Sequence, residues 1–376
     1  LRPSIAGFIT TLVSGGIFVT ILKWVLNIPM PVYLYAILPA VVMVAVGNAI
    51  ITPFLYFPAL RLFRSMHYMS ESDVTDSDHS QLILKQQEEG IVACEHVTYT
   101  YPFSEKPALT DVCLTVEKGD FLVVTGPNGA GKTTLLMSMA GAVPHYFGGC
   151  LSGMVFTGGK AVTQHSISDL ASSIGVILAD YKAQIVTLTV EEEMAFTLEN
   201  HGFPPEEIRR RSKDALAKVH LEGLESRKIS TLSGGQCQRL AVAAALAEEP
   251  EIIVFDEPTS ALDPEGIREF YQMVGELNQK EGLTVIIADH HLEATLPYAK
   301  HFVLMQKGRL MKKGTPESVM KYMKENHIYE EAIPEMYRVQ LDLEQKGFSF
   351  AQPFLSIADA EKSVRDSFRK GEERHA

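Results

Sequence analysis

The sequence predicts an α/β fold whose core is a mainly parallel sheet covered by helices on both faces. Apolar runs of strand length occur at residues 121–125, 174–178, 252–256 and 284–288, and helical stretches separate them. Strands that alternate with helices form parallel sheets, because each helix carries the chain back across the sheet. A glycine-rich segment follows the first run and two acids close the third, so both lie at the carboxyl edge of the sheet, where ligands bind in such folds.

The N-terminal segment, residues 1–68, is predicted to form a transmembrane hairpin. It contains no Asp or Glu. Its two apolar runs, residues 5–26 and 33–60, each exceed the ~20 residues that cross a hydrocarbon core. Its arginines fall on one side of the hairpin, which the positive-inside rule places in the cytoplasm. A cleaved signal peptide is too short to contain both runs. A buried core helix is the alternative for the second run.

The bulk composition limits the ligands to be expected. The chain has 376 residues and a net charge of −12, and because the first 68 residues carry only basic charges, the acidic excess lies in the remainder. No Lys- or Arg-rich patch occurs, so nucleic acid is not an expected partner. The four cysteines have no CxxC spacing and indicate neither a disulfide framework nor a zinc site.

Further segments surround the parallel core. Residues 69–90 are rich in Ser, Asp, Glu and Gln and are predicted to be an acidic linker. Residues 92–99 and 108–116 alternate apolar and polar side chains, which is typical of half-exposed antiparallel strands. A separate helical subdomain is expected over about residues 185–247, and a small C-terminal extension over 317–376.

The glycine-rich segment has the spacing of a phosphate-binding loop between a strand and a helix. Glycines let successive N–H groups converge on phosphates, and the helix N-terminus adds its dipole. Lys132 is expected to reach the β and γ phosphates, and the Thr133 hydroxyl to hold Mg²⁺. An accidental glycine-rich turn does not explain the preceding strand. The expected binding residues are Gly126, Pro127, Asn128, Gly129, Ala130, Gly131, Lys132, Thr133 and Thr134.

Two acids end the strand at 252–256. Asp256 suits Mg²⁺ or a water bound to it, and Glu257 suits a general base that orients the attacking water. Capping of the next turn before Pro258 would explain each acid singly, but not their place beside a phosphate loop.

Residues 232–236, Leu-Ser-Gly-Gly-Gln, precede an alanine-rich helix that ends near Glu249. Ser233 is a plausible N-cap, which is the purely structural interpretation. In addition, Gly234 and Gly235 leave the helix N-terminus open to an incoming γ-phosphate, with Gln236 following them.

This set of motifs resembles the nucleotide-binding domain of ATP-binding cassette (ABC) transporters over residues 91–316. The resemblance implies a P-loop NTPase core with an antiparallel β subdomain and a helical subdomain, and ATP with Mg²⁺ as cofactors. It implies a second ABC ATPase subunit, identical or related, because family members sandwich ATP between one subunit's phosphate loop and the other's Leu-Ser-Gly-Gly-Gln segment.

The resemblance also assigns roles to single residues. Tyr101 matches the aromatic residue that stacks on adenine, with Tyr99 as a competitor. Asp263, at the end of Ser260-Ala-Leu-Asp263, matches the loop that contacts the opposite subunit. His290 matches the switch histidine at the γ-phosphate. A metal site of His290, His291 and Glu293 is disfavoured, because adjacent histidines point apart on most backbones.

Less general stretches resemble the ATPase subunits of energy-coupling factor importers, which take up vitamins and transition-metal ions in prokaryotes. The chain departs from the family at Ala179, where a glutamine that touches Mg²⁺ is usual. We hypothesise that Asp180 or Gln184 substitutes, or that this site hydrolyses slowly. The stretches that match the importer ATPases are 174–176, 184–186, 189–196, 199–200, 314–317, Pro334 and 357–360. The tail from 314 onward resembles their C-terminal extension, and this resemblance implies a role in dimerisation for residues 317–376.

The sequence therefore predicts an ATP-hydrolysing subunit of a membrane importer, at the prokaryotic cell membrane with the ATPase domain on the cytoplasmic face. Transmembrane transporter subunits and membrane lipid are the expected partners. Because the chain begins with Leu1, we expect a fragment or processed product, whose hairpin resembles the last helices of a membrane substrate-binding component. An exporter half and a regulatory nucleotide binder with weak hydrolysis are alternatives. An ATPase acting on ribosomes or DNA is disfavoured, because there is one cassette and no heptad run.

Overall fold

The computed structural model describes residues 90–350, 354 and 357–365. The predicted hairpin and nearly all of the predicted linker lie outside these residues. Among the described helices, none combines the length and the apolar character needed to cross a membrane.

The centre of the fold is a six-stranded sheet with the order β10-β9-β3-β8-β7-β6. Five of these strands run parallel, and β10 pairs antiparallel with β9 at one edge. This confirms the predicted mainly parallel sheet. The strands are β3 (Phe121–Thr125), β6 (Ile174–Ile177), β7 (Ile252–Asp256), β8 (Thr284–Ala288), β9 (His301–Gln306) and β10 (Arg309–Gly314).

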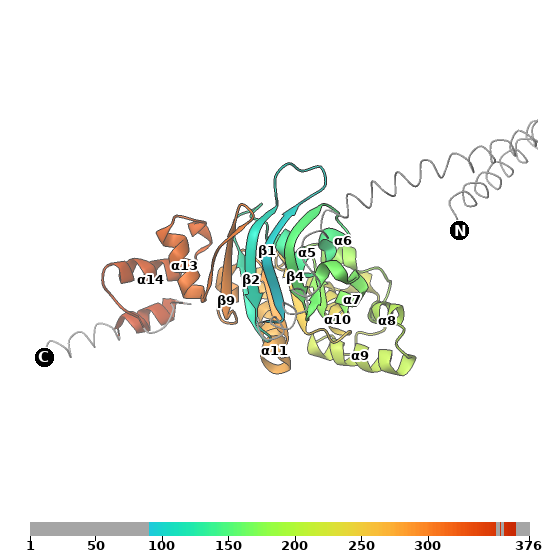
Figure 1. Cartoon of the computed structure of the whole chain (residues 1–376). Coiled ribbons are helices and arrows are strands. Elements are labelled where there is room, and N and C mark those ends of the chain that lie inside the picture. The colour runs from blue at the N-terminus through green and yellow to red at the C-terminus, as the bar shows by residue number, and fades with distance from the viewer. Residues whose placement is uncertain (1–89, 351–353, 355–356, 366–376) are drawn as a thin grey trace, which may run out of the picture. The chain divides into compact units, whose positions relative to one another are not determined.

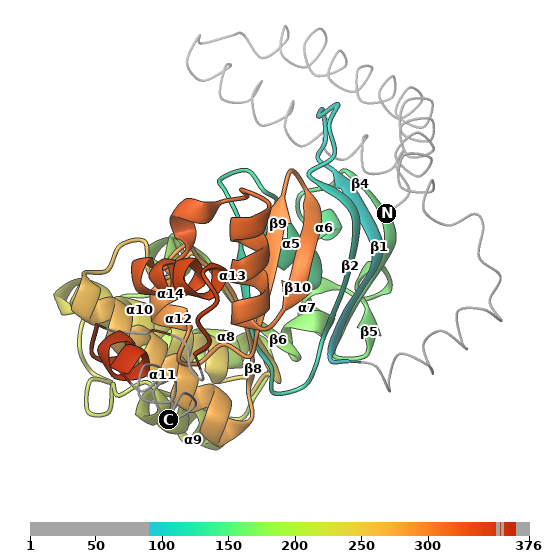
Figure 2. The same cartoon turned by 90° about the vertical axis from the view of Figure 1, so that its left-hand side faces the viewer.

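A second, antiparallel sheet lies beside the first, with the order β2-β1-β4-β5. Figure 2 shows its strands along one side of the domain. The alternation of buried and exposed residues in β2 is the pattern on which the prediction rested. The strands are β1 (Val92–Thr100), β2 (Leu109–Val116), β4 (Cys150–Thr157) and β5 (Lys160–Ala161).

Helices cover the central sheet, and three of them form the helical subdomain. Figure 1 shows α8, α9 and α10 grouped together, away from β9. The described helices are α5 (Lys132–Met139), α6 (Ala142–His145), η3 (Val162–Gln164), α7 (Ile167–Ala171), η4 (Tyr181–Gln184), α8 (Val190–Asn200), α9 (Pro205–Lys218), η5 (Ile229–Thr231), α10 (Gly234–Leu246), α11 (Pro264–Glu281), α12 (Leu292–Thr295), α13 (Pro316–Glu325), η6 (Glu330–Ala332) and α14 (Glu335–Gln345).

Two hydrophobic cores lie on opposite faces of the central sheet. Along β3, Phe121 and Val123 belong to the core that contains side chains of α10 and α11, whereas Leu122 and Val124 belong to the core beneath the antiparallel sheet and α5. This alternation is the period of two expected of a strand. Because β3 is buried on both faces, its sequence is a continuous apolar run. The buried strand fixes the position at which the glycine-rich loop begins.

The C-terminal extension forms helices that pack on the same core as α11. Met320 and Met323 of α13 and Tyr337 and Leu341 of α14 are buried members of that core. The extension therefore packs as part of the described domain.

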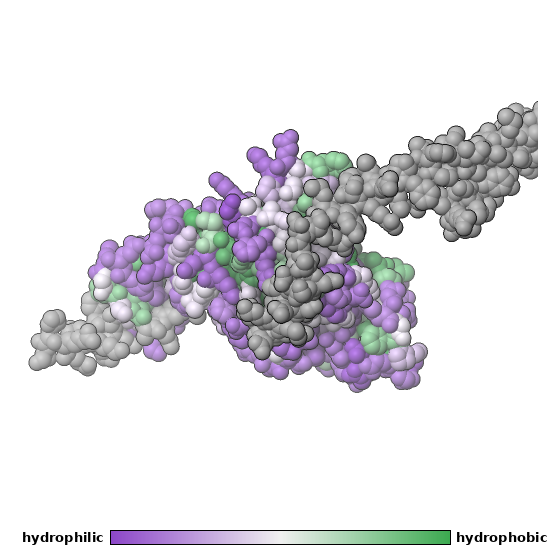
Figure 3. Space-filling model, in the orientation of Figure 1, coloured by the Kyte–Doolittle hydropathy of each residue, from purple (hydrophilic) through white to green (hydrophobic). Residues whose placement is uncertain are grey.

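The face of the molecule drawn in Figure 3 is mostly hydrophilic, with smaller apolar patches.

Candidate functional site

The glycine-rich loop connects β3 to α5 and is packed tightly against the β9–β10 hairpin. Gly126 has φ 145°, and a Cβ there would lie 2.1 Å from the Met305 carbonyl oxygen, so no other residue fits without a shift of the backbone. The Gly308 N–H donates to the Ala130 carbonyl at 2.9 Å, which ties the loop to the hairpin turn. Gly129, with φ 74°, has nothing within 4 Å of its Cβ position. The loop is thus fixed at its base and open at its tip.

Lys132 begins α5, and its side chain folds back into the loop. Only 5% of the residue is exposed, and Nζ donates to the Gly126 carbonyl at 3.0 Å. Burial lowers the pKa of the ammonium group, and the nearby Glu257, Asp256 and Asp289 oppose that change. A buried ammonium group beside curled backbone and a helix N-terminus fits a polyphosphate, because the phosphates would supply the negative charge that Lys132 needs.

Thr133 and Asp256 form a pair of oxygen ligands. The Thr133 hydroxyl donates to Asp256 Oδ1 at 3.0 Å. Burial raises the pKa of Asp256, as does Glu257, while the Thr133 hydrogen bond and Lys132 lower it. A hydroxyl and a carboxylate at one point are ligands that Mg²⁺ accepts. The residues present therefore fit both a phosphate chain and the cation that accompanies it.

Glu257 and His290 meet at the carboxyl edge of the sheet. Glu257 follows β7 with φ 47°, a left-handed conformation that is uncommon for glutamate, and its N–H donates to the Ala288 carbonyl at 2.8 Å. Its Oε1 lies 2.9 Å from His290 Nε2 and 3.8 Å from Lys132 Nζ. The structure thus brings together five predicted residues from three chain segments, namely Lys132, Thr133, Asp256, Glu257 and His290.

Tyr329 contacts this group, and the sequence did not predict it. It lies between α13 and η6, and its hydroxyl is 2.5 Å from His290 Nδ1. Burial, Glu331, Glu257 and Asp289 all raise the pKa of Tyr329. No local pattern marks this tyrosine, because the contact joins residues 39 positions apart in sequence.

Asp289 is a second residue that the sequence analysis missed. It is 2% exposed and accepts hydrogen bonds from the Thr259 hydroxyl at 2.7 Å and the Tyr271 hydroxyl at 2.5 Å. Burial alone raises the pKa of Asp289, but hydrogen bonds from His291, Tyr271 and Thr259 bring it down to about 2. The signal that could have identified Asp289 was its position directly after β8, which matches the position of Glu257 directly after β7.

Of the two tyrosines considered for adenine stacking, the structure favours Tyr101. Tyr99 is fully buried, and its hydroxyl donates to the Gly148 carbonyl at 2.7 Å. Tyr101 is partly exposed, and its hydroxyl lies 3.1 Å from Thr134 Oγ1 at the start of α5. Tyr101 therefore borders the phosphate loop, and its role at adenine stays a prediction.

The segment at 232–236 is built as a helix cap. The Ser233 hydroxyl accepts from the Gln236 N–H at 3.2 Å, and Gln236 Oε1 accepts from the Ser233 N–H at 3.0 Å. Ser233 and Gly234 are exposed, and among the described residues no hydrogen bond connects them to Lys132 or Glu257. Asp263 likewise caps α11, accepting from the Gly266 N–H at 2.7 Å. Their expected roles toward a partner stay predictions.

The two adjacent histidines have different partners. His290 faces Glu257 and Tyr329, whereas His291 Nδ1 lies 3.0 Å from Asp289 Oδ1. The Asp289 hydrogen bond raises the pKa of His291. The two adjacent rings therefore interact with different groups.

The residues around Ala179 offer no replacement for the missing glutamine. Asp180 caps η4 by accepting from the Ala183 N–H at 3.4 Å. Gln184 uses both ends of its amide on the β6 segment, because Oε1 accepts from the Leu178 N–H at 2.9 Å and Nε2 donates to the Val176 carbonyl at 3.0 Å. The hypothesis that either residue substitutes gains no support from these contacts.

Comparisons with known proteins agree with the geometry. A family model described as ABC transporter matches residues 109–260. A protein of Clostridium novyi named as an energy-coupling factor transporter ATP-binding protein is 35% identical over 72% of this chain and 95% of its own length. A protein of Methanosarcina acetivorans named as an ABC transporter ATP-binding protein is 42% identical over 61% of this chain, and the match spans only 37% of that longer protein.

Solved structures show the same fold. A Clostridium perfringens protein described as part of the ABC transporter complex cbiONQ has a TM-score of 0.58 at 29% identity, covering 69% of this chain and 98% of its own. An ATP-binding cassette described as a dimer in a post-hydrolysis state with ADP and Pi has a TM-score of 0.52 at 27% identity, covering 60% of this chain and 98% of its own.

Proposed function

This chain belongs to the ATP-binding proteins of ABC transporters, and from that membership we propose that it hydrolyses ATP to drive a membrane importer of the energy-coupling factor type. The observation that carries the proposal is the convergence of Lys132, Thr133, Asp256, Glu257 and His290 at one edge of the sheet. One named relative is an energy-coupling factor transporter ATP-binding protein, and it supports the importer type.

The side chains divide the reaction among them. Lys132 holds the β and γ phosphates, and Thr133 with Asp256 would hold Mg²⁺, which neutralises phosphate charge. Glu257 accepts a hydrogen bond from the attacking water and takes its proton. As the water oxygen bonds to the γ phosphorus, the bond to the bridging oxygen of ADP breaks. His290, within reach of both Glu257 and Lys132, donates a hydrogen bond to the γ-phosphate.

A second ATPase subunit completes the site in this proposal. Ser233 and Gly234 are exposed at the N-terminus of α10, where backbone N–H groups and the helix dipole favour an anion. No hydrogen bond among the described residues uses this helix end for the chain's own phosphate loop. The dimeric cassette with ADP and Pi supports a pair of ATPase subunits, identical or related, and we propose that they pack head to tail.

The membrane subunits would dock at the helical subdomain. A groove of about 300 Å³ lies between β6, α8 and α10, and Val176, Phe196 and Ala244 are among its lining residues. Val186 and Leu188, just before α8, are 61% and 79% exposed. A groove flanked by exposed apolar side chains is a favourable binding surface for a helix of a partner protein. We infer a hydrophobic segment of a transmembrane transporter subunit as the occupant.

The N-terminal segment, which carries no acidic residue, adds a membrane attachment of the chain itself. Its two apolar runs support a hairpin that anchors the ATPase domain on the cytoplasmic face. Alkaline extraction of membranes that contain the full chain tests this, because an anchored chain stays in the pellet. Release into the supernatant would contradict it.

A regulatory subunit with weak hydrolysis is the second candidate, and Ala179 is the observation that favours it. Alanine offers no ligand for a cation and no hydrogen bond, and Gln184 is committed to β6. Replacing Ala179 by Gln tests this candidate. A clear rise in turnover supports a site slowed by Ala179, and an unchanged rate removes the position from the mechanism.

The experiment for the main proposal compares the full chain with Glu257→Gln. The parent should release phosphate from ATP in a Mg²⁺-dependent manner, and the variant should bind ATP but retain it uncleaved. Glu265→Gln, an exposed acid at the start of α11, is the matched control and should keep the parental rate. A Glu257→Gln chain that turns over ATP as fast as the parent would contradict the role of Glu257.

A further inference from the structure

The C-terminal extension reaches the nucleotide site through one hydrogen bond, between Tyr329 and His290. Tyr329 has φ 53°, a left-handed conformation that is rare for a tyrosine. This backbone directs the hydroxyl to within 2.5 Å of His290 Nδ1. Strained positions of this kind persist where surrounding contacts enforce them, and they cluster at functional sites.

The partners of the His290 ring restrict its proton. An ionised Glu257 carboxylate can accept hydrogen bonds but cannot donate them. Its Oε1 is 2.9 Å from Nε2, so this contact is favourable when Nε2 carries hydrogen. In the neutral ring Nδ1 is then an acceptor, and the Tyr329 hydroxyl must donate to it. The raised pKa of Tyr329 keeps that hydroxyl protonated at neutral pH.

The opposite tautomer is possible but poorer. With hydrogen on Nδ1, the ring would donate to the Tyr329 oxygen, and Nε2 would accept from Lys132 Nζ at 3.4 Å. The bare Nε2 lone pair would then face the Glu257 carboxylate at 2.9 Å, which is repulsive. The Glu257 contact therefore favours hydrogen on Nε2. The Tyr329 hydroxyl stabilises the same tautomer by donating to the bare Nδ1, which would otherwise lack a hydrogen-bond donor there.

We propose that Tyr329 is a positioning residue that holds His290 in the tautomer with hydrogen on Nε2, ready to donate to Glu257 and then to the γ-phosphate. The proposal rests on the proposed ATPase function. It also makes the C-terminal extension part of the active site, because any movement of the segment between α13 and η6 changes the partner of His290.

The first test determines the tautomer of His290 and does not depend on ATP hydrolysis. In ¹⁵N-histidine NMR of the full chain, with His290→Gln used for assignment, His290 should show hydrogen on Nε2 in the parent. Tyr329→Phe should shift it toward a mixture of tautomers. Tyr322→Phe, which removes a hydroxyl from the neighbouring helix α13, is the matched control and should leave the signal unchanged. An identical His290 signal in parent and Tyr329→Phe would overturn the proposal.

The second test measures turnover. Because a single hydrogen bond contributes modestly, Tyr329→Phe should lower kcat about three- to tenfold and change KM for ATP less than about twofold. An unchanged kcat would also overturn the proposal. A parent chain without any ATPase activity would instead contradict the proposed function, and the NMR result would still decide whether Tyr329 sets the tautomer.

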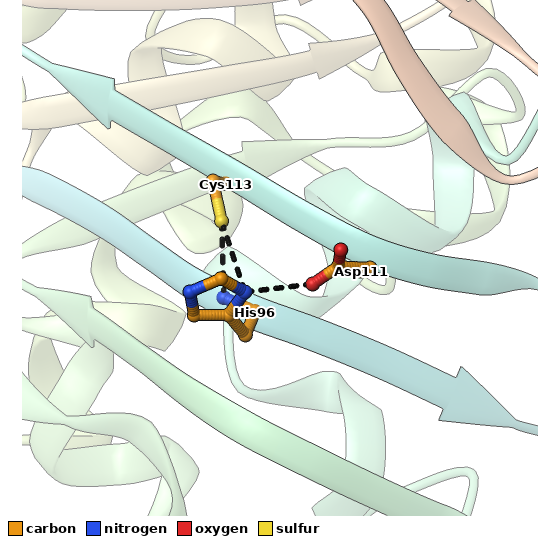
Figure 4. Close-up of side chains that lie close together, drawn as sticks. All are labelled: His96, Asp111 and Cys113. Carbon is orange, nitrogen blue, oxygen red and sulfur yellow. Dashed lines mark hydrogen bonds and ion pairs between the residues drawn. The ribbon is translucent and has the colours of Figure 1, made fainter.

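A separate cluster on the antiparallel sheet carries a second, independent inference. His96 of β1 lies beside Asp111 and Cys113 of β2, and Figure 4 shows the three side chains converging on one face. His96 Nδ1 is 2.7 Å from Asp111 Oδ1 and 3.6 Å from Cys113 Sγ. All three ligand atoms lie within 4.8 Å of one another, and the residues are exposed.

Irregular backbone brings these side chains together. The β1–β2 register shifts between Cys94 and Val97 and again between Val97 and Tyr99. His96 and Asp111 have φ 48° and 51°, which non-glycine residues seldom adopt. Bulges of this kind re-aim side chains. The spacing of the cysteines could not indicate the cluster, because its ligands come from two strands.

We propose that His96, Asp111 and Cys113 bind a Zn²⁺-like cation, with water as the fourth ligand. Imidazole nitrogen, thiolate sulfur and carboxylate oxygen are all zinc ligands, and three of them with water is a known arrangement. Mg²⁺ and Ca²⁺ prefer oxygen ligands, so this set disfavours them. Binding would replace the thiol proton by the metal and would therefore weaken at low pH.

Cobalt titration of the tag-free full chain tests this site. Co²⁺ should produce a sulfur-to-cobalt charge-transfer band, and Zn²⁺ should abolish it by displacement. Cys113→Ser should remove the band, and His96→Gln should weaken Co²⁺ binding at least about tenfold. Cys150→Ser, at another exposed cysteine, is the control and should keep the band. A missing band in the parent, or a band that survives in Cys113→Ser, would overturn the site.

Discussion

Glu257 and His290 lie opposite each other at the ends of neighbouring parallel strands, with Oε1 and Nε2 2.9 Å apart. The register explains the contact, because Asp256 at the end of β7 pairs with Ala288 at the end of β8. Each side chain follows its strand by one or two residues, so the sheet itself sets their separation. Preorganised side chains of this kind stabilise a transition state without a cost of rearrangement.

His290→Ala should lower ATP turnover by about 10²-fold or more, since the loss of one preorganised hydrogen-bond donor to the reacting group has this size. Steady-state kinetics of phosphate release would show the loss in kcat rather than in KM. Replacement of the neighbouring His291, whose partners are Asp289 and Thr259, should reduce kcat much less. Equal losses in the two variants would contradict the assignment of His290.

Lys132→Met should abolish measurable ATP binding without unfolding the chain. The amine is buried beside the loop carbonyls. Its replacement removes the positive charge that would bind the phosphates, and it also removes the free-energy cost of keeping that charge away from water. Binding of a fluorescent ATP analogue measures the loss of affinity, and the melting temperature shows whether the variant stays folded. A variant that binds the analogue as tightly as the parent would show that Lys132 does not reach the phosphates.

Gly126→Ala and Gly129→Ala form a matched pair for the loop. The Gly129→Ala change should cost about 1 kcal/mol, because a left-handed φ is strained for alanine although the space is open. Gly126→Ala should cost at least about 3 kcal/mol, because its Cβ would also collide with the Met305 carbonyl. Urea denaturation gives both values. Equal losses of stability would contradict the packing of the loop against β9.

Asp289 should make the domain sensitive to acid. Its pKa is about 2 in the folded chain against an ordinary 3.8. Its stabilising contribution is therefore present above about pH 4 and is lost as the pH falls toward 2, by about 2 kcal/mol in all. Asp289→Asn should remove this part of the pH dependence, measured by denaturation at pH 7 and pH 3. If the free energy of unfolding falls between pH 7 and pH 3 as much in Asp289→Asn as in the parent, the role of Asp289 is contradicted.

The elements that hold the nucleotide site were predictable because their signals are local. The apolar run before Gly126 and the acids after the run at 252–256 each needed only a few neighbouring residues. The strand predicted over 174–178 ends at Ile177. Leu178 leaves the strand because its N–H is taken by Gln184.

Contacts between distant segments were not predictable in the same way. Tyr329 lies in a segment that the sequence marks only as a small C-terminal extension, and its partner is set by how that extension packs on the core. Asp289 gains its importance from Thr259 and Tyr271, which no spacing rule connects to it. Gln184 was a reasonable candidate by position, but a nearby pair of backbone groups satisfies its amide.

The central claim is that the phosphate loop of this chain is completed by the α10 N-terminus of a second ATPase subunit. The mass of the Glu257→Gln chain with MgATP, purified together with any subunit that accompanies it, tests this most directly. We predict a complex of two ATPase subunits that retains ATP, and loss of that complex in the double variant Glu257→Gln with Gly234→Asp. A monomeric particle with bound ATP, from a chain whose parent hydrolyses ATP at the full rate, would contradict the account.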